Sequence, residues 1–171
     1  MTFDLSILYA LNGFTGVSGM FDAGIIFCAV YLPYLVGISF VLWFLLQLSE
    51  GDKKQAFFVF TVTALLGTGI ILLLHSLYSR ARPYVDHVVT KLVDQGGLSF
   101  PSIHSSIFFS LALIVYGFNK KLSILFFVGA FVITIARVTS GIHYPSDILG
   151  GFSVALISVT LGRYAYKKLL D

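Results

Sequence analysis

A histidine and an aspartate stand four residues apart in the segment GIHYPSDILGG, residues 141–151. Pro145 fits the first turn of a helix, so His143 precedes that helix and Asp147 lies in its first turn. A carboxylate that binds one ring nitrogen fixes the tautomer of a histidine and leaves the other nitrogen free to attack an electrophile. The pair therefore predicts His143 as a nucleophile and Asp147 as its orienting acid.

A second polar segment, SFPSIHSS at residues 99–106, predicts a place for an anion. Pro101 also fits the first turn of a helix. The first backbone N–H groups of that helix, those of Ser102, Ile103 and His104, then have no intrahelical acceptor. A phosphate would meet these groups, the helix dipole and the Ser102 hydroxyl together. As an imidazolium, His104 would protonate a leaving oxygen, and as a neutral base it would activate the water that hydrolyses a phosphohistidine.

Two arginines complete the groups that phosphoryl transfer needs. Arg82 lies in HSLYSRARPYVDH at residues 75–87, and Arg137 lies in ARVTSGIHYPSD at residues 136–147. Each guanidinium can grip phosphate oxygens in pairs and neutralise the charge of an in-line displacement. The three segments together predict phosphoryl transfer without a metal ion or another cofactor.

Other interpretations of the same residues stay open. A single arginine or histidine at the end of a membrane span is more often an interfacial anchor or a structural group. A metal site of His104, His143 and Asp147 would lack a close His pair or Cys cluster, and the arginines would repel a cation. Ser102 is a weaker nucleophile because PSIH is not a nucleophile elbow. The combination favours the phosphoryl-transfer hypothesis.

The elements that must position these residues are set by a strongly apolar composition. The chain has 171 residues, of which 57% are hydrophobic and 11% charged, with a mean hydropathy of +0.93. These values are typical of an integral membrane protein. We expect one membrane-embedded domain, residues 1–171, because no linker or repeat divides the chain. The net charge of +3 is too small to argue for nucleic acid, and we infer no obligatory protein partner.

Five segments are apolar enough to cross a membrane as helices, which need about 20 residues. They are residues 23–48, 56–78, 102–118, 122–139 and 145–166. Residues 3–18 contain Asp4 and Asn12, and we expect a short interfacial helix there, with a sixth, partial span as the alternative. The prediction is an all-α fold, a polytopic transmembrane bundle of five spanning helices plus the short N-terminal helix.

The lysines set the expected orientation of the bundle. The loops at 49–55, 119–121 and 163–171 share one side under this division, and they contain pairs of lysines. The positive-inside rule makes that side the cytoplasm. The three polar segments then lie together on the opposite face, where we expect a site for an anion.

Three motifs in this chain resemble those of the type 2 phosphatidic acid phosphatase superfamily, in order and in spacing. They are RP at 82–83, PSIH at 101–104, and R, H and D at 137, 143 and 147. The resemblance covers residues 56–160 approximately. It implies a helical membrane bundle with His143 as the nucleophile, Asp147 as its orienting acid and His104 as the general acid. The implied phosphate ligands are Arg82, Ser102 and Arg137.

Three positions depart from the motifs of that superfamily. His75 stands where a lysine is usual, seven residues before Arg82. Seven residues make two helical turns, so His75 would face Arg82, with Arg80 as a substitute for the lysine. Ile103 replaces a glycine and would give its backbone N–H to the phosphate. Ala136 replaces a serine before the arginine of the third motif.

Within the superfamily, RPYVDH and GIHYPSDILGG are most similar to bacterial undecaprenyl diphosphate phosphatases of the bacitracin-resistance type. This similarity implies removal of the terminal phosphate from the lipid carrier of cell-wall synthesis, at the outer face of the cytoplasmic membrane. Asp86 and His87 would contact the second phosphate or form a solvated loop pair. The alternatives are phosphatases for phosphatidylglycerophosphate, phosphatidate or lipid A phosphate, and a non-catalytic protein that binds or transports phosphate or a lipid headgroup.

Overall fold

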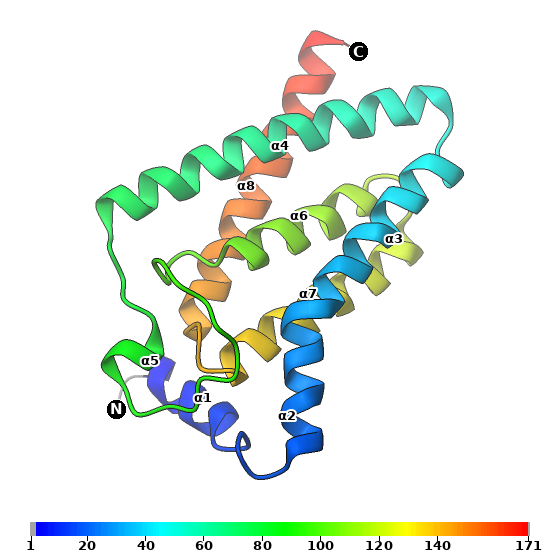
Figure 1. Cartoon of the computed structure of the whole chain (residues 1–171). Helices are drawn as coiled ribbons and strands as arrows, with labels where there is room; N and C mark the ends of the chain where they lie inside the picture. The colour runs from blue at the N-terminus through cyan, green and yellow to red at the C-terminus, as the bar shows by residue number, and fades with distance from the viewer. Residues whose placement is uncertain (1–2, 171) are drawn as a thin grey trace.

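The computed structural model describes residues 3–170, and helices are the regular elements of this range (Figure 1). No strand occurs within it, which confirms the all-α prediction. In chain order the helices are α1 (Phe3–Asn12), α2 (Gly19–Ile26), the π-helical turn η1 (Phe27–Tyr31), α3 (Leu32–Gln47), α4 (Glu50–Leu77), α5 (Pro83–Asp86), α6 (Ile103–Tyr116), α7 (Lys120–Thr139) and α8 (Pro145–Leu169).

Four helical stretches are long and apolar enough to cross a membrane. They are Gly19–Gln47, in which α2, η1 and α3 follow one another without a break, Glu50–Leu77, Lys120–Thr139 and Pro145–Leu169. The predicted span at 102–118 is the shorter helix α6, which has 14 residues. At 1.5 Å per residue it is about 21 Å long, against a hydrocarbon core of about 30 Å. Five spans are therefore not confirmed.

The sixth, partial span that was the alternative is not among the candidate spans of the described residues. The helix α1 has 10 residues, which make about 15 Å of helix, half of the hydrocarbon thickness. The N-terminal segment is instead a short helix, as predicted. It lies beside α5 and the start of α8, at one end of the bundle (Figure 1).

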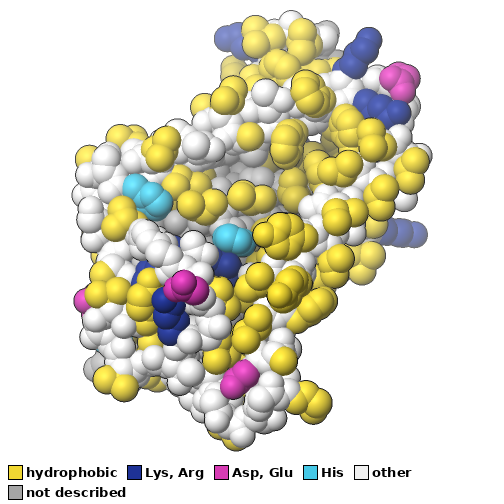
Figure 2. Space-filling view, in the orientation of Figure 1, with side chains coloured by type: hydrophobic (Ala, Val, Ile, Leu, Met, Phe, Trp, Pro, Cys, Tyr) yellow, Lys and Arg dark blue, Asp and Glu magenta, His cyan; other side chains and the backbone are white. Residues whose placement is uncertain are grey.

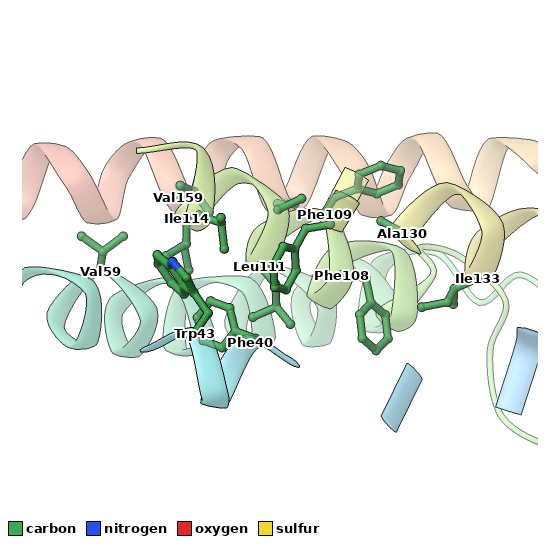
Figure 3. Packing of buried hydrophobic residues seen from close by; sticks show 14 residues of the cluster. Phe40, Trp43, Val59, Phe108, Phe109, Leu111, Ile114, Ala130, Ile133 and Val159 are labelled. Atoms are coloured by element: carbon green, nitrogen blue, oxygen red, sulfur yellow. The ribbon is translucent and has the colours of Figure 1, made fainter. Parts of the chain in front are cut away.

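The helix α6 runs through the middle of the bundle and packs along α7 and α8, while α4 packs along α8 (Figure 1). Nine of its 14 residues are buried. Figure 3 shows Phe109 and Ile114 of this helix within the buried cluster. The Phe109 ring meets Phe131 and Phe152 edge-on, with centroid distances of 5.1 and 5.0 Å. Protein covers most of α6, so lipid thickness does not set its length.

Local sequence brings the starts of α6 and α8 together. Ser102 caps α6 through its side chain, and Pro145 is the first residue of α8. Gly151 allows the two helices to touch, because a Cβ at this position would lie 2.4 Å from the Ser102 carbonyl oxygen. The second glycine of the GG pair in the third motif therefore positions two helix starts, each of which has a histidine beside it.

The three polar segments meet at one end of the bundle. The helices α1 and α5, the connection from residue 78 to 102 and the turn between α7 and α8 lie there together (Figure 1). The lysine-containing turns between α3 and α4 and between α6 and α7 lie at the other end, with the C-terminal end of α8 (Figure 1). The predicted gathering of the polar segments is thus confirmed.

Candidate active site

His143 and Asp147 form a buried pair in the turn before α8 and its first turn. Nδ1 of His143 is 3.3 Å from Oδ2 of Asp147, and the two side chains are 3% and 0% exposed. The same oxygen accepts hydrogen bonds from the Tyr144 backbone N–H at 2.7 Å and from the Ser99 hydroxyl at 2.5 Å. A carboxylate at Nδ1 selects the tautomer that carries its proton there. Nε2 is then unprotonated and keeps its lone pair.

The unprotonated ring nitrogen faces a guanidinium. Nη1 of Arg82 lies 3.1 Å from Nε2 of His143 and donates to the Ile142 carbonyl at 2.9 Å. Arginine has donors only, so Nε2 is the acceptor. Burial lowers the pKa of His143 to about 4, against the opposing effect of the hydrogen bond with Asp147. At neutral pH the ring is uncharged, and its lone pair points at a group that can bind phosphate.

Arg137 places a second guanidinium near the first. It lies in the last turn of α7, is 2% exposed, and is within electrostatic reach of Arg82. Its terminal nitrogens donate to the Ala29 carbonyl at 3.3 Å and to the Gln95 side-chain oxygen at 3.1 Å. Its Nε has no hydrogen-bond partner among residues 3–170. A buried donor of this kind is costly to leave unsatisfied, and an anion between the two arginines would satisfy it.

His104 is the second residue of α6 and stands within electrostatic reach of both arginines and of His143. The ring is half-buried and lies 6.2 Å from the Phe108 ring, measured between centroids. The fold therefore brings together five residues from the three polar segments: His104, His143, Asp147, Arg82 and Arg137.

Ser102 and Ile103 differ in part from their predicted places. The Ser102 backbone N–H donates to the Asp147 carbonyl at 3.0 Å, and its hydroxyl oxygen accepts from the Ser105 N–H at 3.4 Å. The prediction that this N–H is free for phosphate is therefore wrong, because it joins the start of α6 to the start of α8. Ile103 is 47% exposed and finds room for its side chain in a groove between α4 and α6.

Arg80 lies behind the His–Asp pair, which differs from its predicted place as a substitute for the motif lysine. Its Nη1 donates to Oδ1 of Asp147 at 2.8 Å and to the Ser146 hydroxyl at 2.6 Å. Its Nη2 donates to Oδ2 of Asp4 at 2.6 Å. Both terminal nitrogens are thus engaged by protein groups and do not present a phosphate site.

The helical argument for His75 is wrong. The helix α4 ends at Leu77, and the chain is not helical from residue 78 to 82, so His75 and Arg82 do not share a helix face. Nε2 of His75 is buried and has no hydrogen-bond partner among the described residues. A phosphate contact by His75 stays a prediction that this geometry does not support.

Asp86 and His87 lie at the end of α5, beside α1. Asp86 is exposed. The His87 ring meets Tyr9 of α1 edge-on at 6.4 Å and Tyr144 at 5.9 Å, measured between centroids. His87 therefore packs against the N-terminal helix α1. A contact from Asp86 or His87 to a second phosphate stays a prediction.

Four residues around the site were missed from the sequence. Ser99 lies in the second polar segment, residues 99–106, but no pattern in the sequence set it apart from its neighbours. Asp4 did carry one, because an isolated carboxylate in an apolar segment calls for a polar partner. Ser146 and Gln95 follow no pattern that spacing could have shown. Within residues 3–170 no group of three or more His, Cys, Asp or Glu side chains is placed to hold a metal ion.

The fold and the site belong to a known class of membrane enzyme. This chain is a member of the PAP2 superfamily, whose family model matches residues 55–171. Membership confirms the superfamily predicted from the three motifs.

Individual relatives share most of the chain. It is 30% identical over 154 residues to the bacitracin transport permease protein BcrC of Bacillus licheniformis, covering 88% of this chain and 74% of the relative. It is 24% identical over 152 residues to the undecaprenyl-diphosphatase BcrC of Bacillus subtilis strain 168, covering 88% and 78%. The chain is thus related to proteins of the BcrC type, as predicted.

Two solved structures share the fold. One is LpxE of Aquifex aeolicus, with a TM-score of 0.77 and 20% identity over 95% of both chains. The other is a PAP2-type phosphatidylglycerolphosphate phosphatase of Bacillus subtilis, with a TM-score of 0.66 and 23% identity over 97% of this chain and 85% of that one. With the four candidate spans, these likenesses make the chain a multi-pass membrane protein of a phosphatase family.

Proposed function

We propose that this protein removes the terminal phosphate of undecaprenyl diphosphate, without a metal ion, to give undecaprenyl phosphate. The observation that carries the proposal is the uncharged His143 ring, fixed by Asp147 on one side and 3.1 Å from the Arg82 guanidinium on the other. This geometry holds a nucleophile beside a phosphate-binding cation. The relative named undecaprenyl-diphosphatase supports the choice of substrate.

In the first step, Nε2 of His143 attacks the terminal phosphorus, and the bond from phosphorus to the bridging oxygen breaks. Asp147 stabilises the imidazolium that results. Arg82 and Arg137 bind the non-bridging oxygens and neutralise the charge that develops on them. His104 gives its proton to the bridging oxygen, so undecaprenyl phosphate leaves and a phosphohistidine remains.

In the second step, water hydrolyses the phosphohistidine. His104, now neutral, takes a proton from the water as its oxygen attacks the phosphorus. The phosphorus–nitrogen bond breaks, inorganic phosphate leaves, and His143 returns to its uncharged form. One water molecule is consumed, both histidines recover their starting protonation states, and no electron is transferred.

An apolar groove provides a place for the lipid chain. It lies between α4 and α6, has a volume of about 260 Å³, and is lined by Ile71, Ile103 and Ile107 among others. Ile103 directly precedes His104, so one end of the groove lies at the site. Figure 2 shows a hollow among hydrophobic side chains on this face. A prenyl chain in the groove would hold its diphosphate at the start of α6.

The proposed site recognises the phosphate group and not the lipid chain, so other phosphorylated lipids are alternative substrates. The fold is shared with LpxE and with a phosphatidylglycerolphosphate phosphatase. Lipid A phosphate, phosphatidylglycerophosphate and phosphatidate are therefore the alternative substrates. We place the protein in the bacterial cytoplasmic membrane, with the site on the extracytoplasmic face, because the lysine-containing turns lie at the opposite end.

The test is phosphate release by the detergent-purified protein in EDTA. Undecaprenyl diphosphate, phosphatidylglycerophosphate and phosphatidate are compared, with His143→Ala and His104→Ala as controls. We expect strong preference for the diphosphate and loss of turnover in both variants. Full activity of His143→Ala would exclude the nucleophile, and loss of activity in EDTA would establish a metal-dependent reaction. Equal release from the glycerophospholipids would indicate a broad lipid phosphatase, and binding without release would indicate a binding or transport protein.

A further inference from the structure

A chain of charged and polar side chains runs from the His–Asp pair to the N-terminal helix. Oδ1 of Asp147 accepts from Arg80 at 2.8 Å, and Arg80 reaches Oδ2 of Asp4 at 2.6 Å with its other terminal nitrogen. Ser146 links the two ends, since its hydroxyl accepts from Arg80 at 2.6 Å and donates to Asp4 at 2.7 Å. The Ser146 backbone N–H donates to the other oxygen of Asp4 at 2.9 Å.

The contacts on Asp147 divide into a reacting side and a supporting side. Oδ2 faces His143, the Tyr144 N–H and the Ser99 hydroxyl, while Oδ1 has Arg80 as its one partner within residues 3–170. Arg80 therefore fixes the plane of the carboxylate toward the imidazole together with the three donors on Oδ2. A lysine would do this less well, because its ammonium is a single point charge, whereas the planar fork of an arginine gives each carboxylate its own nitrogen.

Packing fixes Arg80 in this place. Its guanidinium lies 3.8 Å from the centre of the Tyr144 ring, and the two carboxylates hold its two terminal nitrogens. Burial raises the pKa of Asp4, but hydrogen bonds from Ser146 and Arg80 outweigh this effect and lower it overall. Asp4 is thus ionised at neutral pH and balances the charge that Arg80 brings.

The helix α1 that carries Asp4 is held at both ends and in the middle. The Asn12 side chain donates to the Thr90 carbonyl at 2.8 Å and to the Thr139 carbonyl at 2.9 Å. Leu8 is fully buried in a cluster with Val138 and Tyr144. The position of Asp4 is therefore set by the fold, although it lies outside residues 55–171, which match the family model.

We infer that Asp4 and Arg80 are positioning residues for the reaction, and that the N-terminal helix completes the active site through them. The inference rests on the proposed function, in which His143 is the nucleophile. Asp4 orients Arg80, Arg80 orients Asp147, and Asp147 orients the imidazole. Neither residue contacts the phosphate, so their loss slows turnover and leaves substrate binding unchanged.

The experiment measures kcat and KM for undecaprenyl diphosphate in detergent. Its variants are Asp4→Asn, Arg80→Gln, Arg80→Lys, the double variant of Asp4→Asn with Arg80→Gln, His143→Ala and the matched control Asp22→Asn. Asp22 also lies in the N-terminal part, but its carboxylate contacts only the Gly16 N–H among the contacts the structure gives. Size-exclusion profiles and Tm values identify variants that fail to fold.

We expect Arg80→Gln to lower kcat about 30- to 100-fold and to leave KM within about twofold of wild type. A reacting group that is misplaced by up to about 1 Å loses about this much in rate. Asp4→Asn should lower kcat about three- to tenfold, because it removes one charged hydrogen-bond partner. The double variant should match Arg80→Gln, because both act through one chain of contacts. Arg80→Lys should recover part of the loss, and Asp22→Asn should show none.

Wild-type kcat in Arg80→Gln, multiplied losses in the double variant, or losses confined to KM would each overturn the inference. If Arg80→Gln fails to fold, Arg80→Lys and Asp4→Asn decide the question by the same split of kcat from KM. Failure of the proposed function looks different, since His143→Ala would then remain active. An inactive His143→Ala beside a fully active Arg80→Gln would leave the proposed function standing and remove the inference alone.

Discussion

Replacing Asp147 by asparagine tests how much of the reaction depends on the carboxylate. Oδ2 of Asp147 accepts from His143, Tyr144 and Ser99, and Oδ1 accepts from Arg80. In Asp147→Asn the amide oxygen can face the first three donors, and the NH2 group then meets the Arg80 guanidinium. The ring keeps its tautomer, but it loses the negative charge beside it, and the amide loses the pairing with Arg80 that orients the carboxylate.

The size of the effect follows from that lost charge. A hydrogen bond to a charged group contributes about 1.5 to 3 kcal/mol, and about 1.4 kcal/mol corresponds to a tenfold change in rate. The Arg80 side chain is 21% exposed, so it can turn toward water and avoid much of the conflict with the new NH2 group. We therefore expect kcat to fall about 10- to 100-fold, less than in His143→Ala.

The assay is the initial rate of phosphate release from undecaprenyl diphosphate over a range of concentrations, for wild type, Asp147→Asn and His143→Ala. Rapid quenching with a substrate labelled on its terminal phosphate follows the phosphohistidine directly, and the label should appear more slowly in Asp147→Asn. A variant with wild-type kcat would refute the role of the carboxylate. A loss as complete as in His143→Ala would show that Asp147 does more than orient and stabilise the ring.

Two further predictions concern the joined helix starts and the nucleophile. Gly151→Ala would place a Cβ 2.4 Å from the Ser102 carbonyl oxygen, so we expect a lower Tm and a kcat at least about tenfold lower. The control Gly69→Ala, whose Cβ would have nothing within 4 Å, should change neither Tm nor kcat. Equal effects of the two substitutions would refute the close approach of the helix starts. The pKa of His143 is lowered by burial to about 4. The unfolded chain takes up this proton near pH 6.5, so the residue's contribution to stability is lost between about pH 6.5 and 4. Ring nitrogen NMR of the free protein should show a midpoint near 4, and a midpoint near 6.5 would contradict the burial argument.

The sequence predicted those parts of the structure that depend on local pattern. Apolar runs predicted the long helices, and the prolines at 101 and 145 predicted the starts of α6 and α8 to within two residues. The spacing of four between His143 and Asp147 predicted their contact, because it depends on a single helical turn.

Other parts of the structure depend on contacts between segments that are distant in the sequence, and no local sequence pattern predicts them. The pair of Arg80 with Asp4 joins residues 76 positions apart. The end of α4 at Leu77 agrees to within one residue with the predicted span at 56–78, but the argument from two helical turns carried the helix on to Arg82. Beyond that end, the Arg80 carbonyl accepts the Ser99 N–H at 2.9 Å, which holds the chain in an extended form. For the same reason the helical argument placed His75 wrongly.

The shortness of α6 would set the depth of the proposed phosphate chemistry in the membrane. Lys120 and Lys121 follow its C-terminal end and hold that end at the cytoplasmic headgroups in the proposed orientation. A helix about 21 Å long then stops about 9 Å short of the opposite side of a hydrocarbon core about 30 Å thick. In this proposed orientation His104 and its neighbours would lie below the outer surface of the bilayer. In the proposed function, a lipid that diffuses laterally would enter through the groove between α4 and α6, lose its phosphate to the water above, and return to the same leaflet without leaving the membrane.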